Sequence, residues 1–421
     1  MKYKISLLFV LICTMSFAQQ SGKKSIEKNL LQTTNKILDA FDTSIQKDIE
    51  AKEIAGAAYL VFHQGKIVRL KAFGEADVAS HRMLQTTDLF RLASMTKPIA
   101  SLAMLLLQED GLINMNDKLE QYLPAFANPV VADKIDTIDG IVYTRTRPAK
   151  KPILLRHLLT HTAGFASQYG GTLGALYLGT FKDPYAHDLA YFTNQLSRLP
   201  LSHEPGDDWV YGPSINVAAR VIEVVSGMPF QDFVKKRIFD PLGMNDTKFY
   251  FDSSFANRLT THYTKDAKGQ LKVEDPGTVS SKLISGPKVY FSGSGGLNST
   301  LQDYLKFCIM VLNNGEYEGK RIAKIETIAM MKTDQVSLNI NAKLLSQPAD
   351  INEGFTFGYQ IERKDNNKDR TLGTISWLGA TGPTFFIDPK KKLVGIYMTQ
   401  MQPYSSIKSR KAFAGTVLSA F

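Results

Sequence analysis

One stretch of the chain, Leu89-Phe90-Arg91-Leu92-Ala93-Ser94-Met95-Thr96-Lys97, leads from a strand-like segment into a strongly apolar run over residues 99–107. This pattern predicts a helix over residues 95–109, ended by Gly111. Ser94 would lie at the positive end of the helix dipole, which favours a developing alkoxide. Lys97 is one turn further on the same face, and burial would lower its pKa and make it a base at neutral pH. The alternative is an ordinary capping serine and a surface lysine.

Alternating apolar patterns lie at both ends of the chain, outside this helix. The pattern predicts strands over residues 57–62, 66–73, 377–387 and 393–400, helices over 26–49 and from about 406, and a mostly helical stretch over 112–250. The economical architecture is an α+β fold, with one antiparallel sheet built from both chain ends, flanked by helices, and a helical region inserted between them.

The composition is that of a globular protein. Of 421 residues, 44% are apolar and 21% charged, which excludes a disordered or fibrous chain. The formal net charge of +10 comes from dispersed residues. Its densest clusters, Lys390-Lys391-Lys392 and Lys235-Lys236-Arg237, are not interleaved with aromatic residues, so we predict no nucleic-acid partner.

The first residues have the features of an export signal. A basic start, an apolar run over residues 5–17 and the small-residue site before Gln19 predict a signal peptide over residues 1–18. The run is too short for a transmembrane anchor, and no other segment is long and apolar enough for one. Removal of the leader takes away Cys13 and leaves Cys308, which we expect to be a buried packing residue.

Other catalytic motifs are missing from the sequence. There is no His-Glu-x-x-His or Cys-x-x-Cys pattern and no Gly-x-Ser-x-Gly elbow, so we predict no metal site and no cofactor. Ser-x-x-Lys is a weak pattern that also occurs at random. It begins at Ser21, Ser25, Ser44, Ser94, Ser285 and Ser405. Only Ser94 follows a strand-like segment and opens an apolar helix.

Ser94-Met95-Thr96-Lys97 resembles the nucleophile motif of the serine β-lactamase and penicillin-binding-protein superfamily, in its class C-related, esterase-like branch. The likeness extends in order over about residues 50–400. It includes Glu109–Leu112, Asp117–Leu119, Tyr122–Pro124, Ile153–Phe165, Glu204–Gly206, Trp209–Tyr211, Pro241–Met244, Ser294–Thr300 and Trp377–Ala380. The resemblance implies a β-lactamase/transpeptidase-like fold. We expect residues 19–110 and 270–421 to form the sheet region and 111–269 the helical region of one catalytic unit.

The resemblance also implies roles for single residues. Tyr211 would be the second catalytic residue, a general base or a proton shuttle. The main-chain amides of Ser94 and Ala380 would form the oxyanion hole, and Gly379 would let substrate lie against the edge strand. Lactamases have an asparagine two residues beyond the tyrosine. Here Pro213 stands there, and we predict that Asn216 partly replaces it in binding substrate.

Trp377 stands where lactamases and transpeptidases have a lysine that holds a substrate carboxylate. With Pro213, this favours neutral esters of small carboxylic acids over β-lactams and peptides. We therefore predict an exported serine hydrolase that forms an acyl-enzyme on a small-molecule ester or amide. The alternatives are D-amino-acid peptidase or β-lactamase activity, and a non-catalytic sensor of wall peptides or antibiotics. His161 is predicted to be a hydrogen-bonded structural residue, because the Ser94, Lys97 and Tyr211 set needs no imidazole.

Overall fold

The computed structural model describes residues 32–138, 141–171, 173–179, 186–336, 340, 353–365 and 370–421. The predicted signal peptide and the first part of the predicted helix over residues 26–49 lie outside this range. The helix is present over residues 32–50. No helix in the described part of the chain has the length and apolar character needed to cross a bilayer.

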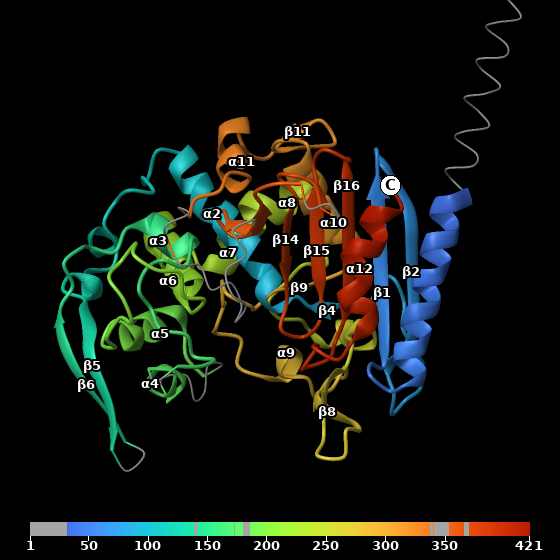
Figure 1. The fold of residues 1–421 in the computed structure, drawn as a ribbon, viewed down its shortest axis with the longest axis horizontal. Helices are drawn as coiled ribbons and strands as arrows, with labels where there is room; N and C mark the ends of the chain where they lie inside the picture. The colour runs from blue at the N-terminus through green and yellow to red at the C-terminus, as the bar shows by residue number, and fades with distance from the viewer. Residues whose placement is uncertain are drawn as a thin grey trace, which may run out of the picture.

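The centre of the molecule is an eight-stranded sheet in the order β12-β13-β14-β15-β16-β1-β2-β3, and every neighbouring pair is antiparallel. The strands are β1 (Gly56–His63), β2 (Lys66–Asp77), β3 (Arg82–Met83), β12 (Glu353–Phe355), β13 (Gln360–Glu362), β14 (Ile375–Leu378), β15 (Thr384–Asp388) and β16 (Leu393–Thr399). Because β1 pairs with β16, the predicted sheet built from both chain ends is confirmed (Figure 1).

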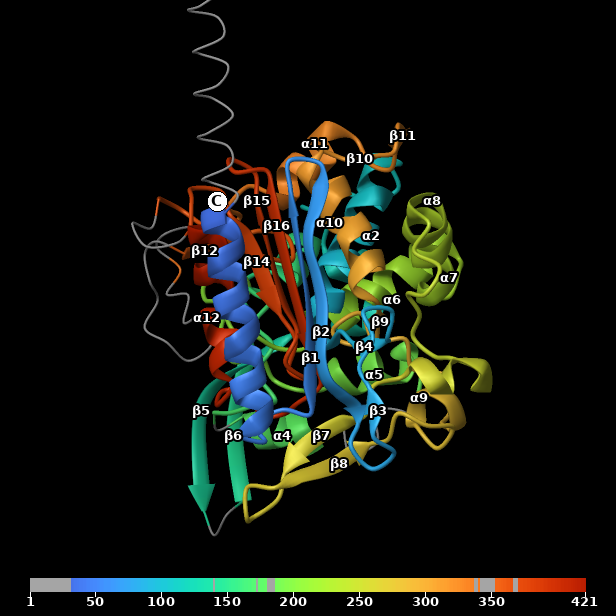
Figure 2. The same cartoon turned by 90° about the vertical axis from the view of Figure 1, so that its right-hand side faces the viewer.

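The two faces of the sheet belong to two hydrophobic clusters. Along β1, Ala58 and Leu60 face one cluster, whereas Tyr59 and Val61 face the other, as the two-residue period of a strand requires. The smaller cluster is covered by the helix over residues 32–50 and by α12 (Lys408–Ser419) (Figure 2). The Thr34 hydroxyl donates to the Ala420 carbonyl at 2.7 Å, which ties the two helices together.

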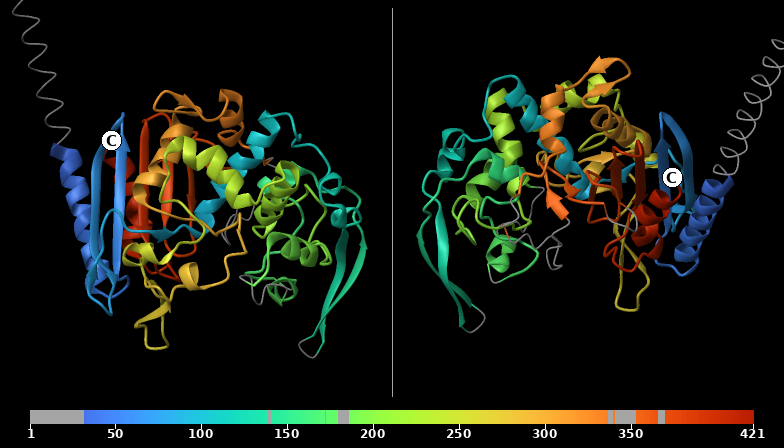
Figure 3. Two further views of the ribbon diagram at one scale, coloured as in Figure 1. Left: turned by 180° about the vertical axis from the view of Figure 1, so that it is seen from behind. Right: turned by 45° about the horizontal axis from the view of Figure 1, so that its top comes forward.

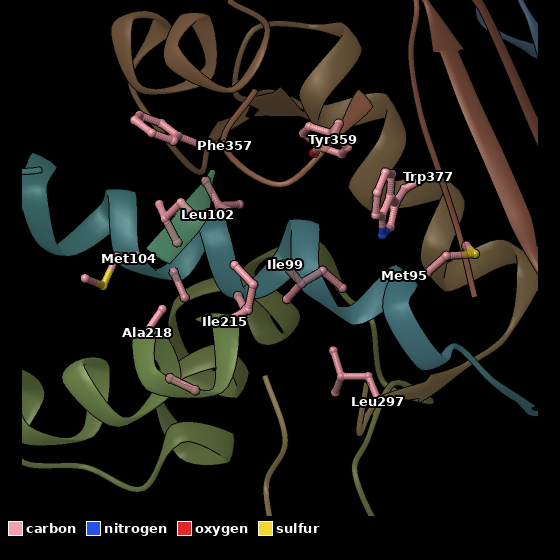
Figure 4. Close-up of a cluster of buried hydrophobic side chains, with 14 of the residues drawn as sticks. Met95, Ile99, Leu102, Met104, Ile215, Ala218, Leu297, Phe357, Tyr359 and Trp377 are labelled. Carbon is pink, nitrogen blue, oxygen red and sulfur yellow. The ribbon is translucent and has the colours of Figure 1, made fainter. Parts of the chain in front are cut away.

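The larger cluster lies on the opposite face and is centred on α2 (Lys97–Glu109), where ten apolar or small side chains are buried along with Lys97. The helix α10 (Leu301–Leu312) also packs on this face and buries Cys308, as predicted. Figure 4 shows α2 between α6 (Ser214–Ser226) and the side chains of Phe357, Tyr359 and Trp377. The buried α2 is therefore the element that joins the sheet to the rest of the molecule.

The chain after α2 forms a layer of helices, most of them short, that shares the larger cluster with α2 (Figure 3). Its elements are η2 (Leu119–Gln121), η3 (Pro124–Phe126), α3 (Leu155–Leu159), α4 (Gly174–Gly179), α5 (Leu189–Leu196), α6, α7 (Phe230–Val234), η4 (Lys235–Phe239), α8 (Asp240–Leu242) and η5 (Ser253–Arg258). The predicted mostly helical stretch also holds a long hairpin that the prediction missed, β5 (Val130–Ile138) and β6 (Ile141–Pro148). It lies at the end of the molecule away from the sheet (Figure 1).

The remaining elements are short. They are β4 (Phe90–Arg91) with β9 (Asn298–Ser299), β7 (His262–Lys265) with β8 (Leu271–Asp275), β10 (Glu316–Tyr317) with β11 (Lys320–Arg321), α9 (Lys282–Ser285) and α11 (Ile325–Met331). The predicted boundary between residues 269 and 270 falls in the β7–β8 hairpin. The division into regions at residues 110 and 270 stays a prediction.

Candidate active site

Ser94 lies in a tight turn between a short strand and α2. The turn is a 3-10 helix over Ala93–Thr96, and Ala93 has a positive φ of 45°, a strained value that non-glycine residues adopt rarely. The α-helix itself begins at Lys97, with Pro98 in its first turn, so the predicted start at residue 95 is two residues early. No side chain caps either helix, and the Ser94 hydroxyl is therefore available for other partners.

The Ser94 hydroxyl is held by the two side chains that the sequence predicted. The Lys97 amine lies 3.0 Å from Ser94 Oγ, and the Tyr211 hydroxyl lies 2.7 Å from the same atom. The Lys97 Nζ also stands over the Tyr211 ring, 4.7 Å from its centroid. The fold thus brings together one nucleophile and two proton-transfer groups from α2 and from the segment before α6.

Burial controls the charge of Lys97. Its side chain is 3% exposed, and no acidic group of the described chain pairs with it. Desolvation lowers the pKa of Lys97 to about 7, so a large share of the amine is neutral at neutral pH. Its other hydrogen bond goes to the Ser294 carbonyl at 2.7 Å. Lys97 can therefore accept a proton from Ser94.

Burial has the opposite effect on Tyr211. Desolvation raises the pKa of Tyr211 well above its ordinary value, and the hydrogen bond with Ser94 only partly offsets this. The phenol therefore stays protonated at neutral pH. Of the two predicted roles, a proton shuttle fits this environment and a phenolate base does not.

The structure corrects the predicted position of Trp377. The indole is 3% exposed and is not among the described residues that line the cleft beside Ser94. It packs against the Tyr211 ring at 5.6 Å and the Phe355 ring at 5.3 Å between centroids. Trp377 thus lies behind Tyr211 rather than beside a substrate.

Gly379 has a packing role that differs from the predicted one. A Cβ at this position would lie 2.3 Å from the Leu92 carbonyl oxygen and 2.7 Å from Pro383 Cγ. Thr381, two residues on, donates its hydroxyl to the Arg91 carbonyl at 3.0 Å. Residues 379–381 therefore run directly alongside the turn that carries Ser94, which is where the predicted oxyanion hole needs the Ala380 amide.

The structure corrects the predicted hydrogen bonding of His161. Neither ring nitrogen has a hydrogen-bond partner in the described chain. The ring instead packs against Tyr211, Trp209 and Phe355, with centroids 4.7, 5.8 and 5.6 Å away. Burial, together with the Lys97 charge, holds the pKa of His161 well below its ordinary value, so the ring is neutral. Its main-chain carbonyl accepts from the Val210 amide at 3.0 Å, next to Tyr211.

Asn216 lies on α6 and is 6% exposed. Its amide group is bonded to the segment of residues 290–294, which ends at the carbonyl that holds Lys97. Pro213, which ends the segment before α6, stands where the sequence comparison places the asparagine of lactamases. The hydrogen bonds of the Asn216 side chain therefore go to the protein itself, while the residue also lines the cleft described below.

A cleft of about 460 Å³ opens beside Ser94, and sequence reasoning missed most of its walls. Besides Tyr211, the aromatic group of lining residues comprises Tyr169, Phe192, Phe249, Tyr250 and Tyr290. A second group is polar and surrounds the ion pair of Arg91 with Asp275. A larger hollow of about 670 Å³ between β13 and α12 contains none of the predicted site residues. No cluster of three potential metal ligands occurs among the described residues.

A serine hydroxyl between a buried lysine amine and a half-buried tyrosine, at the start of a helix packed on an antiparallel sheet, defines a β-lactamase-related serine hydrolase. The chain belongs to the Beta-lactamase family, whose model matches residues 41–415. This also confirms the predicted α+β, β-lactamase/transpeptidase-like fold.

Known relatives cover nearly the whole chain. Protein Rv1367c of Mycobacterium tuberculosis is 30% identical over 90% of this chain and 94% of its own length. The lovastatin esterase of Penicillium rubens is 29% identical over 84% of this chain and 91% of its own length. Among solved structures, EstCE1, described as a hydrolase with promiscuous acyltransferase activity, matches with a TM-score of 0.76 and 24% identity, over 93% of this chain and 98% of that one.

Proposed function

We propose that this chain is an esterase that cleaves small neutral carboxylic esters through an acyl-enzyme on Ser94. The observation that carries the proposal is the Ser94 hydroxyl held at 3.0 Å from an amine whose pKa is about 7. This arrangement activates a serine at neutral pH without a histidine or a metal.

The proposed reaction has two halves. In the first, neutral Lys97 accepts the Ser94 proton as Oγ bonds to the ester carbonyl carbon, and the Ser94 and Ala380 amides stabilise the oxyanion. When the C–O bond breaks, the Tyr211 phenol gives its proton to the leaving alkoxide, and the Lys97 ammonium restores the phenol. In the second half, water attacks the acyl carbon by the same route and releases the carboxylic acid, which restores Ser94.

Two departures from the lactamase pattern support esters over β-lactams and peptides. Trp377 stands in place of the cation that would hold a substrate carboxylate, and the indole is buried behind Tyr211. Pro213 has no side-chain donor for a substrate amide. The aromatic wall of the cleft and the likeness to lovastatin esterase favour the same substrate class.

The test compares three substrates with the wild-type protein, namely a short-chain nitrophenyl ester, a chromogenic cephalosporin and a D-alanyl peptide. We expect the ester to have the highest kcat/KM, and we expect this value to rise with pH through about 7 as Lys97 loses its proton. A fluorophosphonate probe should label wild type but not Ser94→Ala. Ester turnover no faster than the other two would overturn the ester preference. Equal labelling of Ser94→Ala, or no labelling of wild type, would favour the sensor alternative.

We also propose that the chain is exported and starts at Gln19 when mature. The support is the sequence of the first residues alone, with its basic start, apolar run and small-residue site. The test is intact-mass measurement on protein recovered outside the cytoplasm of a bacterial host. A mass lower by residues 1–18 is expected, and full-length protein confined to the cytoplasm would contradict the proposal.

A further inference from the structure

The side chain of Asn216 makes three hydrogen bonds to one short segment of the chain. Its Oδ1 accepts from the Ser292 hydroxyl and from the Ser294 amide, both at 2.9 Å. Its Nδ2 donates to the Tyr290 hydroxyl at 2.8 Å. A buried amide with three hydrogen bonds to one segment fixes the position of that segment, because moving the segment would break these bonds together.

The same segment packs closely against α6 at Gly293. A Cβ on Gly293 would lie 2.8 Å from both Ala219 Cβ and the Ile215 carbonyl oxygen, so only glycine fits between Ser292 and Ser294. The segment has no room to move toward the helix, and the hydrogen bonds of Asn216 prevent it from moving away.

The last residue of the segment touches the catalytic amine. The Ser294 carbonyl accepts a hydrogen bond from Lys97 Nζ at 2.7 Å, while the same nitrogen lies 3.0 Å from Ser94 Oγ. A neutral amine has two N–H groups and one lone pair. When one N–H is directed at a fixed carbonyl, rotation about the last bond of the lysine is restricted, and the lone pair can be kept toward the serine hydroxyl.

We propose that Asn216 is a positioning residue for Lys97, acting through the main chain of Ser294, and not a substrate ligand. This inference rests on the proposed esterase function of the same site. Asn216 lines the cleft, but the hydrogen bonds of its side chain go to Tyr290, Ser292 and Ser294 and not to Ser94 or Lys97. It holds the carbonyl that aims the base, and so affects the rate of proton transfer and the proton affinity of the amine.

Two substitutions at this position have opposite expected effects on the amine. Asn216→Ala frees the segment, which misplaces the Ser294 carbonyl, and we expect kcat to fall about 10–100-fold with little change in KM. Since that carbonyl binds the ammonium more strongly than the amine, its loss should move the acid limb of the pH profile to lower pH. Asn216→Asp keeps two acceptors for Ser292 and Ser294 but adds a negative charge. We expect Asn216→Asp to keep most of the wild-type activity at high pH. The acid limb of its pH profile should move to higher pH.

The matched control is Thr247→Ala. Thr247 is also buried and bonded to its neighbours Ser299 and Asp303, but it does not line the cleft. Thr247→Ala should lower the melting temperature, as Asn216→Ala should, but it should leave the pH profile of ester hydrolysis unchanged. This separates general loosening of the fold from loss of positioning.

The readout that does not depend on turnover is an NMR titration of Lys97 in protein labelled with 13C at the lysine ε-carbon. We expect the Lys97 pKa to fall in Asn216→Ala and rise in Asn216→Asp. An unchanged Lys97 pKa in both variants would overturn the inference, as would a raised KM with unchanged kcat in Asn216→Ala. A wild type that neither hydrolyses esters nor takes the fluorophosphonate would count against the proposed function, and the titration would still decide the role of Asn216.

Discussion

Burial of the Lys97 amine lowers the stability of the folded protein, because the charged form loses its hydration. The same burial provides the neutral amine that the proposed reaction needs. The unfolded chain keeps the proton up to the ordinary pKa of 10.5, whereas the folded protein releases it near pH 7. Between these values the unfolded chain binds more protons, so the Lys97 contribution to stability rises with pH across this range and is least favourable below it. We expect Lys97→Met to abolish ester turnover and to raise the free energy of unfolding by about 1–3 kcal/mol at pH 6. Urea unfolding at pH 6 and pH 9.5 measures the difference in free energy of unfolding between Lys97→Met and wild type. This difference should be smaller at pH 9.5. A gain that grows with pH would contradict this account.

At this scale the sequence predicted which residues meet at the site but not how their neighbours behave. Ser94 and Lys97 were found from a short motif that opens an apolar helix, whereas Tyr211 was identified only through the resemblance to the β-lactamase superfamily. The prediction that Trp377 faces the substrate and the prediction that His161 is hydrogen-bonded were wrong, because the sequence does not show which groups a side chain faces. Both pack against Tyr211, so their contribution is to the shape around the phenol.

The end of β14 and the turn before α2 act as one unit, since Gly379 lies against Leu92. Gly379→Ala would place a methyl group 2.3 Å from the Leu92 carbonyl oxygen, so the two segments must separate and carry the Ala380 amide away from Ser94. We expect kcat to fall about 100-fold, the loss typical of one oxyanion-hole donor, with a smaller effect on KM. Steady-state kinetics on the nitrophenyl ester measure it. The control is Gly179→Ala at the end of α4, where a Cβ meets nothing within 4 Å. Wild-type kcat in Gly379→Ala would show that the strand end has no part in catalysis.

Elements with a clear period were predictable, and those that depend on local turns were less so. The strands β1 and β16 match their predicted ranges closely, because each alternates between two buried faces. The partly exposed β2 runs four residues beyond its predicted end. The predicted strand over residues 377–387 is instead two strands, since residues 379–383 form a turn closed by the Gly379 amide and the Pro383 carbonyl at 2.8 Å. The missed β5–β6 hairpin had a signal in Asp139-Gly140, a dipeptide typical of hairpin turns between alternating segments.

The whole molecule should unfold as one unit, because the two hydrophobic clusters on the faces of the sheet share its central strands. β1 and β16 each give alternate side chains to both clusters, so neither cluster survives loss of the other. The alternating patterns at both chain ends predicted that one sheet is built from both ends. They did not show which side chains belong to which hydrophobic cluster. Cys308 offers a probe of the sharing of strands between the clusters, because it is fully buried on α10 in the larger cluster and burial raises the pKa of its thiol.

We expect Cys308 in a Cys13→Ser background to resist a thiol reagent in the native protein and to react fully after unfolding in urea. The smaller cluster is followed separately by the change in fluorescence of a label on α12 at Lys411, whose side chain is exposed. Thiol reactivity, label fluorescence and helical circular dichroism should all change at one urea concentration, as a two-state transition requires. The control is a protein labelled at Lys36 on the helix over residues 32–50, which should report the same midpoint. A thiol that becomes reactive before the label on α12 responds would show that the larger cluster opens on its own, and that the shared strands do not couple the two faces of the sheet.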